Sequence, residues 1–183
     1  MEDSLHLGAS SWKFPSWRGL IYSNETLPAR FLAEYATRFS CVEVDQWYWS
    51  LFSPDQPPVL PKPETAADYA ALVPPHFRFG IKLPDALTLT HYRPRSDNAP
   101  LRPNPYFLSQ DLLAAFLERI APLKPLLGPL MLQFGYLNRQ MMESQNTFQK
   151  RLKSFLEKVP PQYSWAIECR NPAWLNSSFL QFL

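Results

Sequence analysis

Strand-like apolar segments alternate with helix-like segments along the chain. The five apolar segments cover residues 5–12, 41–48, 77–83, 129–134 and 164–170, with turn residues around each of them. Between them, apolar residues recur at helical spacing over 29–38, 65–73, 112–123 and 146–159. The starts of successive apolar segments are 36, 36, 52 and 35 residues apart, and the longest interval holds a proline-rich stretch. This repeat of strand and helix predicts βα units that build a parallel sheet.

Two architectures fit such a repeat, a doubly wound open sheet and a closed barrel of eight βα units. Neither a GxGxxG nor a GxxxxGK[ST] motif follows the first apolar segment, so the nucleotide-binding open sheets lose their main support. We therefore predict an α/β fold of the (β/α)8 TIM-barrel type, formed by residues 1–183 as one domain. A complete barrel has about 250 residues. With only five units in 183 residues, we expect a barrel that is incomplete at its C-terminus and open to self-association through its strand edges.

Composition narrows the function classes. Lys and Arg number 18 and Asp and Glu 16, for a formal net charge of +2, which disfavours a strongly basic nucleic-acid-binding protein. The two cysteines form no CxxC motif, so they indicate neither a disulfide framework nor a thiolate metal site. The acidic start is unlike a signal peptide, and no apolar run reaches the length of about 18 residues that a membrane span needs. We therefore predict a cytoplasmic protein with no membrane partner.

Five motifs follow one another in the order GASSWKFPSWRGLIY, FSCVEVDQWYW, HFRFGIKLP, LGPLMLQF and WAIECRNPAW. Together they resemble the YecE-like family, a TIM-barrel family of unknown function. Two positions depart from the family pattern, because Ser11 replaces a glycine in the first motif and Asp45 replaces an asparagine in the second. The third and fifth motifs are intact and include Lys82, Glu168 and Arg170. The resemblance implies a barrel with a pocket at the carboxyl ends of its strands, and it brings no established reaction.

Candidate functional residues lie where the predicted strands end, because barrel active sites are built there. The period-two alternation turns Glu43, Lys82, Gln133 and Glu168 away from the apolar faces of their strands and into the barrel. Carboxylates provide general acid and base, and cations hold an anion. We predict catalytic roles for Glu43, Glu168, Lys82 and His91, and substrate-binding roles for Ser10, Trp12, Asp45, Tyr48, Gln133, Arg170, Asn171 and Trp174. The set favours a hydrolase that acts on a small anionic or phosphorylated substrate.

These assignments have structural alternatives. Two carboxylates and two cations inside a barrel also form satisfied ion-pair networks that hold the strands in register. Aromatic residues such as Trp12 and Trp174 also pack over a barrel mouth without binding a ligand. A lone loop histidine such as His91 is often a surface residue.

Other ligand classes have weaker support. The sequence requires no cofactor, and a divalent cation held by Glu43, Asp45 and Glu168 is the only metal site that it offers. The rival function is a non-catalytic ligand- or nucleic-acid-binding protein that uses the aromatic residues and the arginines of residues 91–102. A shortened chain that is inactive by itself is the third alternative.

Overall fold

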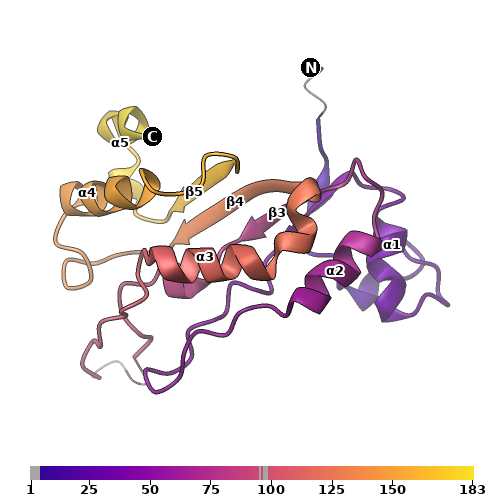
Figure 1. Ribbon diagram of the computed structural model, residues 1–183, viewed down its shortest axis with the longest axis horizontal. Coiled ribbons are helices and arrows are strands. Elements are labelled where there is room, and N and C mark those ends of the chain that lie inside the picture. The colour runs from indigo at the N-terminus through magenta and orange to yellow at the C-terminus, as the bar shows by residue number, and fades with distance from the viewer. Residues whose placement is uncertain (1–4, 95, 97–98) are drawn as a thin grey trace.

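The structure is a computed structural model that describes residues 5–94, 96 and 99–183. Within these residues, five strands form one all-parallel sheet in the order of the chain (Figure 1). The strands are β1 (Gly8–Ala9), β2 (Cys41–Val44), β3 (Arg78–Lys82), β4 (Leu127–Phe134) and β5 (Trp165–Cys169). The helices are α1 (Phe31–Tyr35), α2 (Pro63–Ala71), α3 (Gln110–Arg119), α4 (Gln145–Leu156) and α5 (Ser177–Phe182). Short 3-10 helices cover Pro15–Trp17, Pro28–Arg30, Asp85–Leu87, Ala121–Leu126 and Pro172–Trp174.

The predicted alternation of strand and helix is confirmed. Most elements are shorter than the sequence indicated, although β4 begins two residues before the predicted strand. The first strand keeps only two of its eight predicted residues, because the chain then leaves the sheet and buries Trp12 against Tyr69 of α2. The predicted helix over 112–123 ends as an α-helix at Arg119 and continues as 3-10 turns, because Pro122 and Pro125 lack the N–H that an α-helix needs. The sheet is open over the described residues, with β1 and β5 at its edges.

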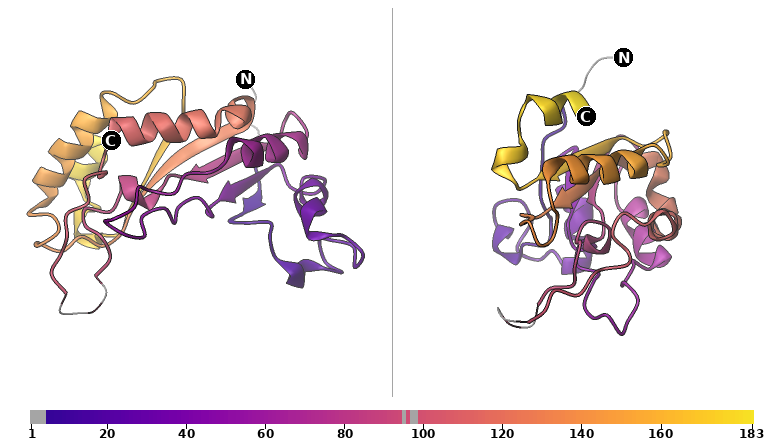
Figure 2. Two further views of the ribbon diagram at one scale, coloured as in Figure 1. Left: turned by 60° about the horizontal axis from the view of Figure 1, so that its bottom comes forward. Right: turned by 90° about the vertical axis from the view of Figure 1, so that its left-hand side faces the viewer.

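One face of the sheet forms the hydrophobic core. Register pairs Val42 of β2 with Phe79 of β3, and Ile81 of β3 with Leu130 of β4, so these buried side chains share a face. Helices α3 and α4 cover this face with the buried residues Leu112, Leu113, Phe116, Phe148, Leu152 and Phe155. Figure 2 shows α3 lying along the strands. The described residues include no helix that is long and apolar enough to cross a membrane.

Within the described residues, the opposite face carries mainly polar and small side chains, and no helix covers it. Cys41, Glu43, Gly80, Lys82 and Met131 lie on this face and are only half-buried. Parallel sheets in proteins are usually covered on both faces. The uncovered face is therefore where this fold has room for a ligand or for further polypeptide.

A buried carboxylate joins the loops that follow β2 and β3. Asp85 is completely buried, and its Oδ1 accepts hydrogen bonds from the backbone N–H of Ser50 and of Leu51, each at 2.9 Å, and from the Ser50 hydroxyl at 2.8 Å. Its Oδ2 lies 2.7 Å from Nη1 of Arg93. A buried carboxylate is tolerated only with such partners. Because Ser50 and Asp85 belong to different loops, this contact fixes the loops relative to each other.

Replacing Asp85 by alanine should lower the free energy of unfolding by about 3–5 kcal/mol, because Arg93 and two backbone N–H groups lose their partner. Urea unfolding measures this difference. The matched control is Glu168→Ala, which breaks an ion pair whose side chains are 35% and 56% exposed and should cost about 0–1 kcal/mol. Equal losses in the two variants would contradict the assignment.

Candidate functional site

Polar side chains form a row across the carboxyl ends of β2 to β5, on the uncovered face. Nζ of Lys82, at the end of β3, lies 3.0 Å from Oε1 of Glu43 on β2. Gln133 of β4 is in register with Glu168 of β5, and Nε of Arg170 donates to Oε1 of Glu168 at 2.7 Å. We call these five residues the polar row. Their placement confirms the face that period-two alternation predicted.

Gln133 is the buried member of the polar row. Only 6% of the residue is exposed, and its Oε1 has no hydrogen-bond partner within the described part of the chain. A buried carbonyl oxygen without a donor costs about 1–3 kcal/mol. This oxygen is therefore an unused hydrogen-bond acceptor in the buried part of the polar row.

The charges of the polar row cancel in two pairs, Lys82 with Glu43 and Arg170 with Glu168. These pairs agree with the ion-pair network that the sequence left open. Each cation nevertheless keeps donors, because an ammonium group has three N–H bonds and a guanidinium has five. The hydrogen bond that Arg170 donates to the Glu168 carboxylate raises the pKa of Arg170, so this guanidinium stays charged. The polar row can therefore bind an anion without losing its internal pairs.

The two carboxylates of the polar row belong to strands that are not neighbours. Neighbouring strands lie about 4.8 Å apart, so the three intervals from β2 to β5 amount to about 14 Å. Carboxylates that act together on one bond are usually about 5–10 Å apart. The geometry thus does not favour Glu43 and Glu168 as an acid–base pair. No three His, Cys, Asp or Glu side chains among the described residues are grouped to hold a metal ion, so Glu43, Asp45 and Glu168 do not form a metal site.

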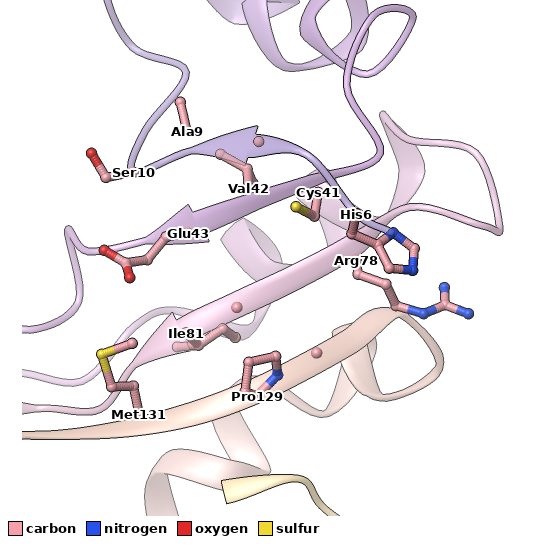
Figure 3. A pocket seen from close by; sticks show the side chains of 13 residues that line it. His6, Ala9, Ser10, Cys41, Val42, Glu43, Arg78, Ile81, Pro129 and Met131 are labelled. Atoms are coloured by element: carbon pink, nitrogen blue, oxygen red, sulfur yellow. The ribbon is translucent and has the colours of Figure 1, made fainter. Parts of the chain in front are cut away.

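Three further predicted residues lie near the same end of the sheet. Ser10 follows β1 and lines the same cavity as Glu43 (Figure 3). Asp45 directly follows β2 and is half-buried. Tyr48 lies in the loop after β2, is 9% exposed and packs edge-to-face on Trp49.

Three other predicted binding residues make packing contacts or hydrogen bonds within the protein instead. Trp12 is 3% exposed and packs edge-to-face on Tyr69, and Trp174 packs on Phe148 of α4 with ring centroids 5.2 Å apart. Asn171 donates through Nδ2 to the backbone oxygen of Leu137 and accepts from its N–H through Oδ1, both at 2.9 Å. These contacts leave little of the three side chains for a substrate, and they favour the packing interpretation of the two tryptophans.

His91 lies apart from the polar row. Its Nδ1 is 2.9 Å from Oγ1 of Thr90, and its pKa is lowered first by burial and then by the nearby Arg151 of α4. The predicted catalytic role of His91 receives no support from this position.

The lowered pKa of His91 predicts a pH-dependent stability. A histidine whose pKa is lower in the folded state contributes stability above its ordinary pKa of about 6.5, and this contribution is lost as the pH falls. Between pH 7 and pH 5, the free energy of unfolding should fall more steeply in the wild type than in His91→Gln. Urea unfolding at several pH values measures these slopes. His76→Gln, at an exposed position before β3, is the matched control, and equal slopes in the three proteins would contradict the prediction.

The uncovered face also contains a cavity of about 420 Å³ that was not predicted from the sequence. We call it the trough. Figure 3 shows Ser10 and Glu43 near one end and His6 and Arg78 near the other, with Cys41 between them. Three of the five glycines of the chain, Gly8, Gly80 and Gly128, also line it. Glycines in the first and third predicted strands and directly before the fourth were the sequence signal that could have revealed the trough.

Comparisons with known proteins give a family and no reaction. A family model described as "Protein of unknown function DUF72" matches residues 6–183. The UPF0759 protein YecE of Escherichia coli, in strains K12 and O157:H7, is 28% identical over 172 residues, which are 92% of this chain and 49% of YecE. A crystal structure of a DUF72 family protein from Enterococcus faecalis V583 matches with a TM-score of 0.60 and 24% identity, over 96% of this chain and 54% of that one. The chain spans about half the length of these relatives.

Proposed function

Because the chain belongs to the DUF72 family of proteins of unknown function, its chemistry has to be inferred from its own side chains, and we propose that the polar row binds and hydrolyses a small anionic or phosphorylated substrate. The observation that carries this proposal is the buried Oε1 of Gln133, which has no donor although it belongs to a row of charged side chains. A site of this kind is stabilised when a bound molecule brings a hydroxyl or N–H group to the Gln133 oxygen and an anionic oxygen to the remaining N–H donors of Lys82 and Arg170.

The role of each residue in the polar row follows from the hydrogen-bonding groups that its internal contacts leave unused. Lys82 uses one N–H toward Glu43, so two remain to hold an anionic oxygen of the substrate. Gln133 accepts a hydrogen bond from a hydroxyl group of the substrate or from water. Arg170, whose side chain is 56% exposed, holds a second oxygen through its terminal nitrogens.

Hydrolysis requires one proton to leave the attacking water and one to reach the leaving oxygen. Glu43 accepts the proton of the water, whose oxygen forms the new bond to phosphorus or carbon as the ester bond breaks. Lys82 gives a proton to the leaving oxygen. The two side chains are 3.0 Å apart, so transfer of the proton from Glu43 to Lys82 restores both. This pair needs no contribution from the distant Glu168.

We also propose that the sheet is part of a (β/α)8 barrel, with the polar row at the inner side of its mouth. The all-parallel chain order, the free edges of β1 and β5 and the coverage of about half of longer relatives support this proposal. A crystal structure of the protein is the test. Further parallel strands paired with β1 and β5, from the same chain or another, are the expected result, and edges that remain bare in solvent would contradict it.

Lys82→Met should weaken the binding of inorganic phosphate at least about tenfold, because a charge-assisted hydrogen bond contributes about 1.5–3 kcal/mol. Glu43→Gln should keep phosphate binding and lose hydrolysis of phosphate monoesters. Titration calorimetry measures the binding, and phosphate release measures the reaction.

The matched control for Lys82→Met is Lys124→Met, at an exposed position in the 3-10 helix before β4. Thermal melts confirm that each variant is folded. The proposal is wrong if both lysine variants bind phosphate as the wild type does.

One observation favours the non-catalytic alternative. Trp49 is 57% exposed, and the guanidinium of Arg93 lies 4.6 Å from the centroid of its ring. Exposed aromatic rings beside arginines are typical of surfaces that bind single-stranded nucleic acid. Arg95, another arginine of that loop, lies outside the described residues. Oligonucleotide binding that weakens steeply with salt and is unaffected by Lys82→Met would favour this function over hydrolysis.

A further inference from the structure

A second cavity lies on the helix side of the sheet, between the segment that leads into α3 and the second half of α4 (Figure 1). Its volume is about 280 Å³, and the rings of Phe107 and Phe155 form its apolar part. Nε2 of Gln110, the first residue of α3, donates to the backbone oxygen of Phe155 at 2.9 Å, so the two helices meet here. We call this cavity the basic pocket.

The charged residues that line the basic pocket are all cations. Arg151 and Lys158 line it together with the hydroxyl residue Ser154, and all three are exposed to solvent. They share one side of α4 and its end, because they are three and four residues apart in the sequence. The acids next to lining residues in the sequence, Asp111 and Glu157, do not line the pocket. A cavity with this balance of charge attracts anions.

Arg151 is held in place with its hydrogen-bond donors unused. Its guanidinium lies 4.6 Å from the centroid of the Phe107 ring, which is 7% exposed. Contact with an aromatic ring orients a guanidinium without an acceptor atom, so its five N–H groups can still donate. Within the part of the chain that the structure describes, they have no hydrogen-bond or ion-pair partner. The side chain is therefore prepared to bind an oxygen anion.

The other polar groups of the basic pocket also have unused donors. Among the described residues, neither the ammonium of Lys158 nor the hydroxyl of Ser154 has a hydrogen-bond partner. The position of Lys158 beyond the last residue of α4 is favoured by the helix dipole, which attracts cations to that end. Arg151 lies in the middle of α4, so the dipole does not account for it. A guanidinium, an ammonium and a hydroxyl around one cavity are donors that phosphate groups bind.

The backbone beside the basic pocket is strained. Leu108, another lining residue, has a φ of 54°, and no other non-glycine residue that the structure describes has a positive φ. Its backbone N–H donates to the oxygen of Leu87 at 3.0 Å, which helps to hold this conformation. Strained backbone of this kind is concentrated at functional sites. The strain therefore agrees with a binding role for this part of the molecule.

We propose that the basic pocket binds the phosphate group of a small phosphorylated molecule, with Arg151, Lys158 and Ser154 as the donors. A volume of about 280 Å³ has room for the phosphate and a short organic part. The site lies on the opposite side of the sheet from the polar row and shares no residue with it. The inference thus goes beyond the proposed function and does not depend on it.

Calorimetric titration with inorganic phosphate tests the proposal in Lys82→Met, in which the polar row contributes least. We expect this variant to bind phosphate, and addition of either Arg151→Met or Lys158→Met should weaken the binding at least about tenfold, the effect of one charge-assisted hydrogen bond. The matched control is addition of Lys153→Met, at an exposed position of α4 that does not line the pocket. Thermal melts confirm that each variant is folded.

The outcomes separate the two phosphate sites. The basic pocket is not a phosphate site if Lys82→Met binds no phosphate, or if neither Arg151→Met nor Lys158→Met weakens the binding more than Lys153→Met does. Loss of all wild-type binding in Arg151→Met would instead support the basic pocket and contradict the anion site at Lys82.

The imidazole of His91 reports on the basic pocket in the wild-type protein. Burial and, after it, the charge of Arg151 lower the pKa of His91, so an anion bound at Arg151 should raise this pKa. NMR titration of His91 in sulfate, a tetrahedral dianion like phosphate, and in chloride at equal ionic strength measures the effect. Sulfate should raise the pKa more than chloride does in the wild type, and the two salts should act equally in Arg151→Met. Equal pKa values in both salts in the wild type would overturn the proposal.

Discussion

The structure depends on a parallel sheet that is buried on one face only. Burial of apolar side chains is the main stabilising contribution to folding, and here it lies between one face of the sheet and helices α1 to α4. The backbone alternation that sends Val42 and Ile81 into this core sends Glu43 and Lys82 to the other side. The charged groups are therefore held in place by the core without being part of it. The polar row and the trough are both consequences of this one-sided burial.

The loops that frame the polar row are held in place by their own contacts. Asp85 is buried beneath the carboxyl ends of β2 and β3, where its carboxylate holds the backbone of Ser50 and the side chain of Arg93. The backbone N–H of Asp85 also donates to the oxygen of Tyr48. One buried charge thus orders the loops that frame the polar row, which is how a binding site keeps its geometry without a ligand.

The sequence predicted the strand part of the site better than the loop part. Glu43, Lys82, Gln133 and Glu168 share a face because side-chain direction along a strand follows from the period of two alone. Trp12, Asn171 and Trp174 come just after strands, where direction depends on the course of the loop, and the structure turns the two tryptophans onto Tyr69 and Phe148 and joins Asn171 to Leu137. Asp85 was missed for the same reason, since only the folded loops bring Ser50 and Arg93 to its carboxylate.

By itself, the sequence determined the order of strands and helices, the apolar face of each strand and the charged residues opposite that face. These properties are local, because they follow from the spacing of apolar residues over a few turns or a few strand positions. Tertiary structure decided which charges pair, that Gln133 is buried without a donor, and that Gly80 leaves space beside the polar row. Such properties depend on register and loop packing between segments that are about 35 or more residues apart in the sequence. A pattern of neighbouring residues does not specify which of these distant segments come into contact.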